Sequence, residues 1–274
     1  MQFGYHPTPP ALARAVKAVW FARGTKRDFD VAEPIVPDGC VEIVFNLADP
    51  FMHVGADGSL TRQPIDLLAG QMTRPTIALP SGDVDLLGVR FWPGRAGAVL
   101  RTPMWELQDQ LVSASSALGG VDRLIAELRE LDHDRRIERV ARALAPRCAA
   151  VDVHSLRLVE CALAQIWRRR GQVKIEQLAK DAGVSRRHLE RQFRDRVGLR
   201  AKHVARIVRI QSVLELIRLQ PELTGAAVAA QCGYSDQAHL IHECKTLTGT
   251  TPARLSSTEP SLSVLMRHTS SEEI

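Results

Sequence analysis

The chain has 274 residues, a hydrophobic content of 45% and a formal net charge of +5 at pH 7. This length is sufficient for two domains, and no apolar run reaches the ~18 residues of a membrane span. The N-terminus also lacks the apolar core of a signal peptide, so a cytoplasmic protein without a membrane partner is expected. The five cysteines are scattered and form no CxxC pair, so neither a metal site nor a disulfide framework is indicated, and no cofactor is expected.

Residues 1–120 have the features of a β-rich domain with flanking helices. A helix is predicted over 11–21, because its apolar residues share one helical face. Proline and glycine then recur, and short β-forming runs lie between them at 41–45, 66–69, 76–79 and 86–91. Several short strands at close spacing indicate a β-barrel or sandwich, and small barrels commonly enclose one ligand.

Two charged residues, Glu42 and Arg90, interrupt the predicted strands. By strand alternation, Glu42 shares a face with Val44 and Asn46. If the faces that carry Glu42 and Arg90 are interior, the two side chains are candidates for binding a polar effector. The alternative is that they face solvent or pair with each other.

Residues 121–150 are predicted to form a helical connector with amphipathic helices at 122–131 and 135–144, closed by Pro146. Ser155 can cap a further helix over 156–170, because its hydroxyl can accept a hydrogen bond from a backbone N–H group. A helical domain is then expected over 151–256. The polar, serine-rich residues 257–274 are predicted to be a disordered tail.

The segment 175–193 predicts two short helices joined by a tight turn. Apolar residues at helical spacing give the first helix a buried face, and Gly183 tolerates a left-handed conformation. Ser185 is a suitable N-cap for the second helix, in which Leu189 and Phe193 point inward and arginines lie outside. This is the helix-turn-helix pattern of DNA-binding proteins, although two solvated helices of an ordinary bundle would also fit it.

A second copy of the pattern lies at 228–235 and repeats residues 178–185. Small residues, the turn glycine Gly233 and the capping Ser235 match position for position, and one extra residue follows. Two copies of a rare arrangement are improbable by chance. A helix of about residues 200–219, stopped by Pro221, would act as a stiff spacer between the copies.

The positive charge is concentrated in residues 154–255, which hold 18 Lys and Arg against 9 Asp and Glu, whereas residues 1–153 hold 17 against 19. A basic block joined to a near-neutral partner is the electrostatic footprint of a nucleic-acid-binding domain. A basic surface kept for solubility is the alternative, but it does not account for the clustering of arginines within the first motif.

These C-terminal residues resemble the DNA-binding domain of the AraC/XylS transcription regulators. The second motif of that family reads close to A-x-x-C-G-[FY]-S-D-Q-x-[HY]-[LF], followed by G-x-[ST]-P. Here Ala229, CGYSDQAHL at 232–240 and GTTP at 249–252 fit it. In the N-terminal part, PDGCVEIVFN at 37–46 and GVRFWPG at 88–94 resemble the sensor region of a subgroup of these regulators.

The resemblance implies an α+β protein of two domains, with a β-rich barrel- or sandwich-like sensor domain and an all-α double helix-turn-helix domain. The implied function is a sequence-specific transcription regulator, an activator, that reads successive major grooves and responds to a small molecule. Double-stranded promoter DNA is the expected partner. A small-molecule effector, RNA polymerase and a second copy of the chain in a homodimer are further candidates. Such a protein is expected to be associated with the nucleoid.

By position, the resemblance assigns the base-reading residues. They are Arg187, Glu190 and Arg191 in the first recognition helix and Ala238, His239 and His242 in the second. Arginine can donate two hydrogen bonds to guanine, and glutamate can accept one from cytosine, so the first helix is expected to contribute more than the arginine-poor second helix. Phosphate contacts are expected for Ser185, Arg186, Arg194, Ser235 and Gln237.

Two other functions stay open. In one, the N-terminal domain only dimerises and binds no ligand. In the other, an enzyme such as a DNA-repair alkyl acceptor is fused to the DNA-binding domain, with Cys40 as nucleophile. Cys40 has no basic or histidine neighbour in the sequence that would lower its pKa. The first 120 residues hold only His6 and His53, too few for a histidine-rich metal site, so a non-enzymatic protein is expected.

Overall fold

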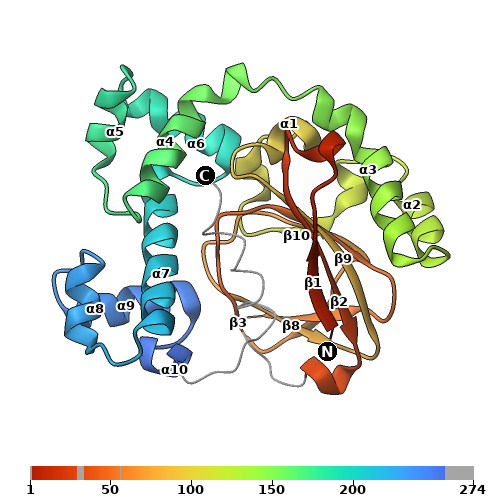
Figure 1. Cartoon of the computed structure of the whole chain (residues 1–274), viewed down its shortest axis with the longest axis horizontal. Helices are drawn as coiled ribbons and strands as arrows, with labels where there is room; N and C mark the ends of the chain where they lie inside the picture. Colours follow the sequence, from red (N-terminus) through yellow and green to blue (C-terminus); the bar gives the residue numbers. More distant parts are fainter. Residues whose placement is uncertain (1, 30–33, 56, 257–274) are drawn as a thin grey trace.

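The computed structural model describes residues 2–29, 34–55 and 57–256, in which a β-rich part is followed by a helical part (Figure 1). The β-rich part contains two antiparallel sheets. The six-stranded sheet consists, in spatial order, of β1 (Gln2–His6), β2 (Val16–Gly24), β9 (Val84–Phe91), β4 (Glu42–Asn46), β7 (Asp66–Ala69) and β10 (Leu111–Ser113). The four-stranded sheet consists of β3 (Pro34–Ile35), β8 (Thr76–Pro80), β5 (Phe51–Val54) and β6 (Leu60–Arg62). The four predicted strands are β4, β7, β8 and β9.

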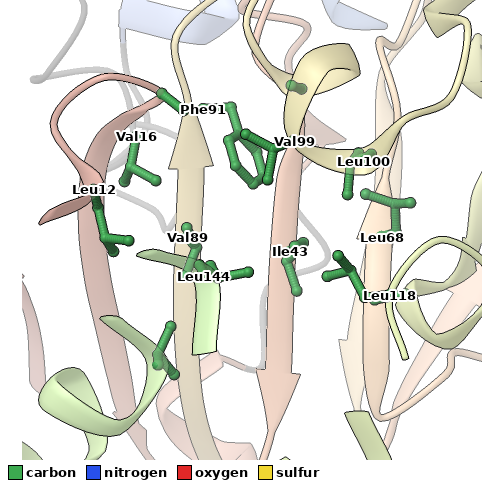
Figure 2. Packing of buried hydrophobic residues seen from close by; sticks show 14 of the residues in the cluster. Leu12, Val16, Ile43, Leu68, Val89, Phe91, Val99, Leu100, Leu118 and Leu144 are labelled. Atoms are coloured by element: carbon green, nitrogen blue, oxygen red, sulfur yellow. The ribbon is translucent and has the colours of Figure 1, made fainter. Parts of the chain in front are cut away.

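The six-stranded sheet is buried on both faces. On one face, Ile43 and Val89 belong to an apolar cluster that includes residues of four helical elements (Figure 2). These elements are η1 (Pro10–Leu12), α1 (Ala96–Leu100), α2 (Val121–Arg129) and α3 (His133–Ala149). On the other face, Trp20 and Leu86 pack with Phe51 of the four-stranded sheet. The helices α2 and α3, predicted as a connector, therefore share the core of the β-rich part.

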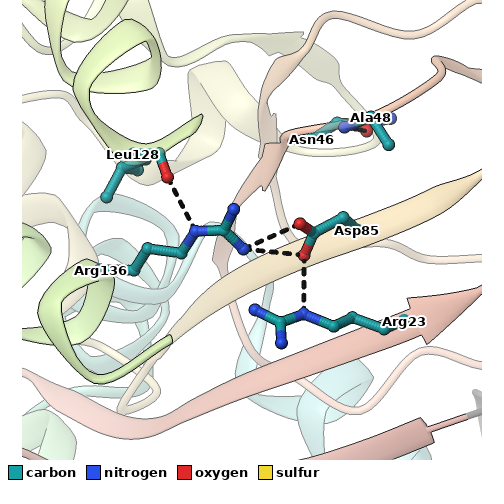
Figure 3. A network of polar contacts seen from close by, with 6 residues as sticks. All are labelled: Arg23, Asn46, Ala48, Asp85, Leu128 and Arg136. Carbon is teal, nitrogen blue, oxygen red and sulfur yellow. Dashed lines mark hydrogen bonds and ion pairs between the residues drawn. The ribbon is translucent and has the colours of Figure 1, made fainter. Parts of the chain in front are cut away.

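A buried arginine also ties α3 to the sheet. Arg136 donates from Nη1 to Asp85 Oδ2 on β9 at 2.8 Å and from Nε to the carbonyl oxygen of Leu128 at 2.7 Å (Figure 3). Asp85 also accepts a hydrogen bond from Arg23 Nε on β2 at 3.1 Å. Because the charge of Arg136 is paired and its donors are used, its burial does not leave an unsatisfied cation.

The helix predicted over 11–21 is wrong. The segment instead forms the short turn η1 and the strand β2, which pairs with β1 on one side and with β9 on the other. Residues of β2 enter both apolar clusters, with Val16 facing the helices and Trp20 facing the second sheet. A strand with two buried faces carries apolar residues on both of them, so the sequence of β2 matched a helical spacing by coincidence.

The helical part begins with α4 (Arg157–Arg168) and continues through α10. Its further helices are α5 (Ile175–Asp181), α6 (Arg186–Val197), α7 (Ala201–Leu219), α8 (Gly225–Gln231), α9 (Gln237–Thr248) and α10 (Pro252–Ser256). The spacer helix predicted over about 200–219 is α7, which connects α4–α6 to α8–α10 (Figure 1). The apolar cluster of this part begins at Val159 of α4, whereas that of the β-rich part ends at Leu156. Among the buried residues that the structure describes, only Val36 of the β-rich part belongs to the helical core.

Two predicted helix boundaries are wrong. Pro146 lies inside α3, in its last turn, and does not end the helix. Proline has no N–H group, so the helical bond to the carbonyl oxygen four residues back is missing at this position, yet α3 continues to Ala149. The hydroxyl of Ser155 donates to the carbonyl oxygen of Asp152 at 2.8 Å, and α4 begins two residues later without a side-chain cap. The predicted disordered tail, 257–274, lies outside the described residues.

The two parts are in direct contact. Arg95, which follows β9, donates from Nε to Glu160 Oε1 of α4 at 2.7 Å. At the end of α6, Gly198 has a φ of +89°, and a Cβ there would lie 2.7 Å from the carbonyl oxygen of Met104. Only glycine allows this close approach. Within the described ranges, no helix is long and apolar enough to cross a membrane.

Candidate nucleic-acid interface

The first helix-turn-helix motif is built as predicted. Gly183, between α5 and α6, has a φ of 68°, which glycine adopts without steric cost. Ser185 is the N-cap of α6, and its hydroxyl oxygen accepts a hydrogen bond from the backbone N–H of His188 at 3.1 Å. Leu189 and Phe193 are fully buried. Local turn chemistry and a small apolar core therefore hold α6 against α5 and leave its other side to solvent.

The base-reading candidates on α6 differ in their surroundings. Arg187 and Arg191 are exposed, and Arg191 Nη2 lies 3.2 Å from His188 Nδ1 on the same helix. Glu190 is half-buried, and its Oε2 is shielded from solvent with no hydrogen-bond partner among the described residues. A shielded carboxylate oxygen without a donor is unfavourable, so Glu190 would be stabilised by a donor from a ligand.

The two arginines expected at phosphates have partners within the chain. Arg186 Nη1 donates to Glu176 Oε1 of α5 at 2.5 Å. The guanidinium of Arg194 lies over the ring of Trp105, 5.3 Å from its centroid, in η3 (Met104–Leu107) of the β-rich part. Both arginines are exposed. Arg194 therefore lies at the contact between the two parts, which the sequence did not indicate.

The second motif repeats the construction with one difference. Thr224 caps α8, and Gly233 has a φ of 72° at the turn. The expectation that Ser235 caps the second recognition helix is wrong, because the N-cap of α9 is Asp236, whose Oδ1 accepts from the backbone N–H of His239 at 2.8 Å. The extra residue of the second copy moves the start of α9 by one position, so Asp236 takes the place that Ser185 has in the first.

All base-reading candidates on α9, namely Ala238, His239 and His242, are exposed, as is Gln237. The ring of His239 is held in place by its neighbours. Its Nδ1 lies 3.1 Å from Ser235 Oγ, and its plane is edge-on to the ring of Tyr234 with centroids 5.2 Å apart. His239 thus presents Nε2 as its outer polar atom. The Ser235 hydroxyl also donates to Asp236 Oδ2 at 3.0 Å.

A buried ionic cluster, which was not predicted from the sequence, fixes α9 on α7. Glu243 of α9 is 6% exposed and accepts from Arg206 Nε of α7 at 3.0 Å and from the Tyr234 hydroxyl at 3.1 Å. Arg209 of α7 lies over the Tyr234 ring, 4.9 Å from its centroid. Burial, and next the Glu243 charge, raise the pKa of Tyr234, so its hydroxyl remains a donor. The signal in the sequence that could have indicated this cluster was a glutamate at a position on the inward face of α9.

In the β-rich part, Glu42 and Arg90 pair with each other across β4 and β9. Arg90 is 3% exposed and also contacts Asp38 Oδ2 through Nη2 at 3.0 Å. Burial raises the pKa of Glu42, and the adjacent Arg90 charge opposes this shift. Glu42 lines a cavity of about 110 Å³ between the two sheets, together with side chains such as Trp20, Phe51 and Thr76.

Cys40, the candidate nucleophile of the alkyl-acceptor alternative, is buried. Burial, with a further contribution from the Asp38 charge, raises its pKa to about 12. Its sulfur is therefore a protonated thiol at neutral pH. Activated cysteines have lowered pKa values, so this environment is the opposite of the one that an alkyl acceptor requires.

The assignment of the α9 cap gives a prediction for stability. Asp236→Ala is expected to lower the urea midpoint of unfolding at pH 7 more than Ser235→Ala does, because only Asp236 accepts the N-cap hydrogen bond. That bond lowers the pKa of Asp236 from its ordinary 3.8, so the stabilisation is complete above this value and is lost as pH falls through the folded pKa. A larger effect of Ser235→Ala at pH 7 would contradict the assignment.

Comparisons with known proteins agree with this architecture. Residues 178–257 match the family described as a helix-turn-helix domain, and residues 5–113 match a domain of unknown function, DUF6597. No curated protein sequence matches the chain.

Among solved structures, ToxT from Vibrio cholerae has 11% sequence identity and a TM-score of 0.46, over 93% of this chain and 98% of that chain. ToxT from strain O395 bound to (E)-4-(8-methylnaphthalen-1-yl)but-3-enoic acid has 11% identity and a TM-score of 0.44, with the same coverage. Unsaturated fatty acid-bound wild-type ToxT has 10% identity and a TM-score of 0.43, over 87% and 93% of the two chains.

The match over 178–257 confirms the resemblance that the motif residues indicated. The chain thus joins an N-terminal DUF6597 domain to an AraC-type helix-turn-helix domain, which supports a role in DNA binding and transcription regulation.

Proposed function

We propose that the protein reads a specific DNA sequence with both motifs, placed in successive major grooves. The observation that carries this proposal is the exposure of Arg187 and Arg191 on α6, the second helix of a motif whose core is otherwise fully packed. An exposed arginine on such a helix can donate two hydrogen bonds to a guanine edge. The spacer α7 has 19 residues, which corresponds to about 28 Å, close to the ~34 Å between successive turns of a groove.

The proposed roles of the other residues follow from their positions. Glu190, Ala238, His239 and His242 would add base contacts, whereas Ser185, Arg186, Arg194, Ser235 and Gln237 would contact phosphates. Arg186 and Arg194 would have to exchange Glu176 and Trp105 for phosphate oxygens. RNA polymerase and a second copy of the chain are further proposed partners, and the nucleoid is the proposed location. The proposed DNA-binding unit is residues 151–256, which follow the β-rich domain of residues 1–120 and the helical connector of residues 121–150 in the sequence.

We also propose that a small polar molecule binds in the cavity between the sheets and modulates DNA binding. The indole N–H of Trp20 lies near the Glu42 carboxylate in this cavity, shielded from solvent and without a hydrogen-bond partner of normal geometry. A ligand with an acceptor would satisfy Trp20, and a donor on the same ligand, such as a small amide or amino alcohol, could compete with Arg90 for Glu42. A volume of about 110 Å³ limits it to roughly six heavy atoms or fewer unless the walls move.

DNA reading is tested by selecting duplexes from a random library with the purified full chain. We expect enrichment of a bipartite site and an affinity that falls steeply as salt rises from 50 to 200 mM, by roughly a hundredfold or more for several neutralised phosphates. Failure to enrich any sequence over the starting library would reject sequence-specific recognition.

The ranking of the two motifs is tested on the selected duplex. Arg191→Ala is expected to weaken binding about tenfold or more, within roughly 1–3 kcal/mol, because a two-bond contact to guanine is lost. His242→Ala is expected to cost less, and Arg123→Ala, an 86% exposed side chain of α2, should leave affinity unchanged. Circular dichroism verifies folding. If His242→Ala proves more damaging than Arg191→Ala, the second motif is the main reader.

The cavity proposal is tested by a thermal-shift screen of the full chain with small amides and amino alcohols. At least one compound is expected to raise the melting temperature of the natural protein. The same compound should have a smaller effect on Trp20→Phe, which removes the indole N–H but keeps an aromatic ring. An equal shift in both proteins would place the compound elsewhere. No shift with any compound would favour the alternative in which the N-terminal domain only dimerises.

A further inference from the structure

The buried ionic group around Arg90 extends from the cavity to the loop 37–40. On the cavity side, Arg90 pairs with Glu42, which lines the cavity. On the other side, Arg90 Nη2 contacts Asp38 Oδ2 at 3.0 Å. Asp38 belongs to the loop 37–40, which leads into β4. One nearly inaccessible guanidinium is therefore shared between a carboxylate at the proposed ligand site and a carboxylate in this loop.

Hydrogen bonds hold the loop in a defined shape. Asp38 Oδ1 accepts from the backbone N–H of Cys40 at 2.8 Å. The fully buried Gln71 donates from Nε2 to the carbonyl oxygen of Gly39 at 2.7 Å. Gly39 itself has a φ of +82°, in the region that favours glycine. A displacement of the Asp38 side chain would therefore be passed to the loop backbone.

The same loop is attached to the helical part. Gln211 Nε2, on α7, donates to the carbonyl oxygen of Pro37 at 2.8 Å. Val36, the preceding residue, packs in the apolar cluster of the helical part. Trp167 of α4 also reaches the loop, since a Cβ on Gly39 would lie 3.9 Å from its ring. The loop 37–40 thus joins the Arg90 group to the helix that spaces the two recognition helices.

We infer that Asp38 and Gln211 are positioning residues that transmit occupancy of the cavity to α7, by way of Arg90 and the loop 37–40. Buried charges have to stay paired, because an uncompensated buried ion is strongly unfavourable. A ligand that donates to Glu42 weakens the hold of Glu42 on Arg90, and Arg90 then shifts toward Asp38. The loop moves with Asp38, and Gln211 carries the change into α7. This inference rests on the cavity as the ligand site of the proposed function.

The connection can be tested without a ligand and without DNA. Glu42→Gln removes the carboxylate charge while it keeps the shape of the side chain. Hydrogen–deuterium exchange of the full chain is expected to rise, roughly threefold or more, in peptides that cover 37–41 and in peptides of α7 around residue 211. Glu130→Gln, an exposed glutamate at the end of α2, is the matched control and should leave both peptides unchanged.

The role of Gln211 is isolated in a second background. Gln211→Met keeps the length of the side chain but removes the N–H donor. The double variant Glu42→Gln/Gln211→Met is compared with Gln211→Met alone. The rise in hydrogen–deuterium exchange at 37–41 is expected to persist, and the rise in α7 is expected to disappear. A purely structural role of Gln211 would change the baseline exchange of α7 but would leave its response to Glu42→Gln intact, and that result would overturn the inference.

Two further outcomes are decisive. If Glu42→Gln does not fold, Asp38→Asn replaces it, because it breaks the same connection at a less buried site and is expected to produce the same two responses. No change in α7 with either variant overturns the inference. Such a result would not bear on ligand binding or on DNA reading, because the exchange experiment uses neither a ligand nor DNA. Conversely, a thermal-shift screen that finds no ligand would not change the result of the exchange experiment.

Discussion

The position of both recognition helices depends on one buried helix, α7. Its residues Val204, Ile207, Ile210 and Val213 are almost inaccessible, and it packs against α4, α6, α8, α9 and α10. The first motif is attached to it by apolar contacts, and the second also by the buried ionic cluster of Glu243. Because α7 packs on so many sides, neither motif can rotate about it without disturbing the packing of the other motif. The separation of the two motifs is therefore fixed by the packing of the domain itself.

Buried charge has a similar use in both parts of the molecule. Arg90 joins two strands and a loop, and Glu243 joins two helices and a tyrosine. Replacing such groups with apolar residues often costs little stability, so their value lies in the geometry that they specify. In the β-rich part, this geometry connects the cavity to the loop 37–40. In the helical part it sets the angle of α9. The exposed Arg194 adds a connection between the two parts, because its guanidinium stacks on Trp105. This stacking would compete with a phosphate contact.

Features with local causes could be predicted from the sequence. The turn glycine Gly183, the capping Ser185 and the inward Leu189 each act within a few residues, so the first motif was predicted correctly. Features that depend on distant partners were not. Residues 16–21 form a strand because a second sheet and a layer of helices cover its two faces. Glu243 is inward because α7 supplies Arg206. The N-cap of α9 is Asp236 and not the predicted Ser235, which shows that one extra residue can move a cap.

The claim that α7 holds two readers one helical turn of DNA apart is tested most directly by hydroxyl-radical footprinting of the full chain on its selected duplex. Two protected patches are expected on one face of the DNA, with centres about 10 base pairs apart. A single patch, or two patches on opposite faces, would contradict it.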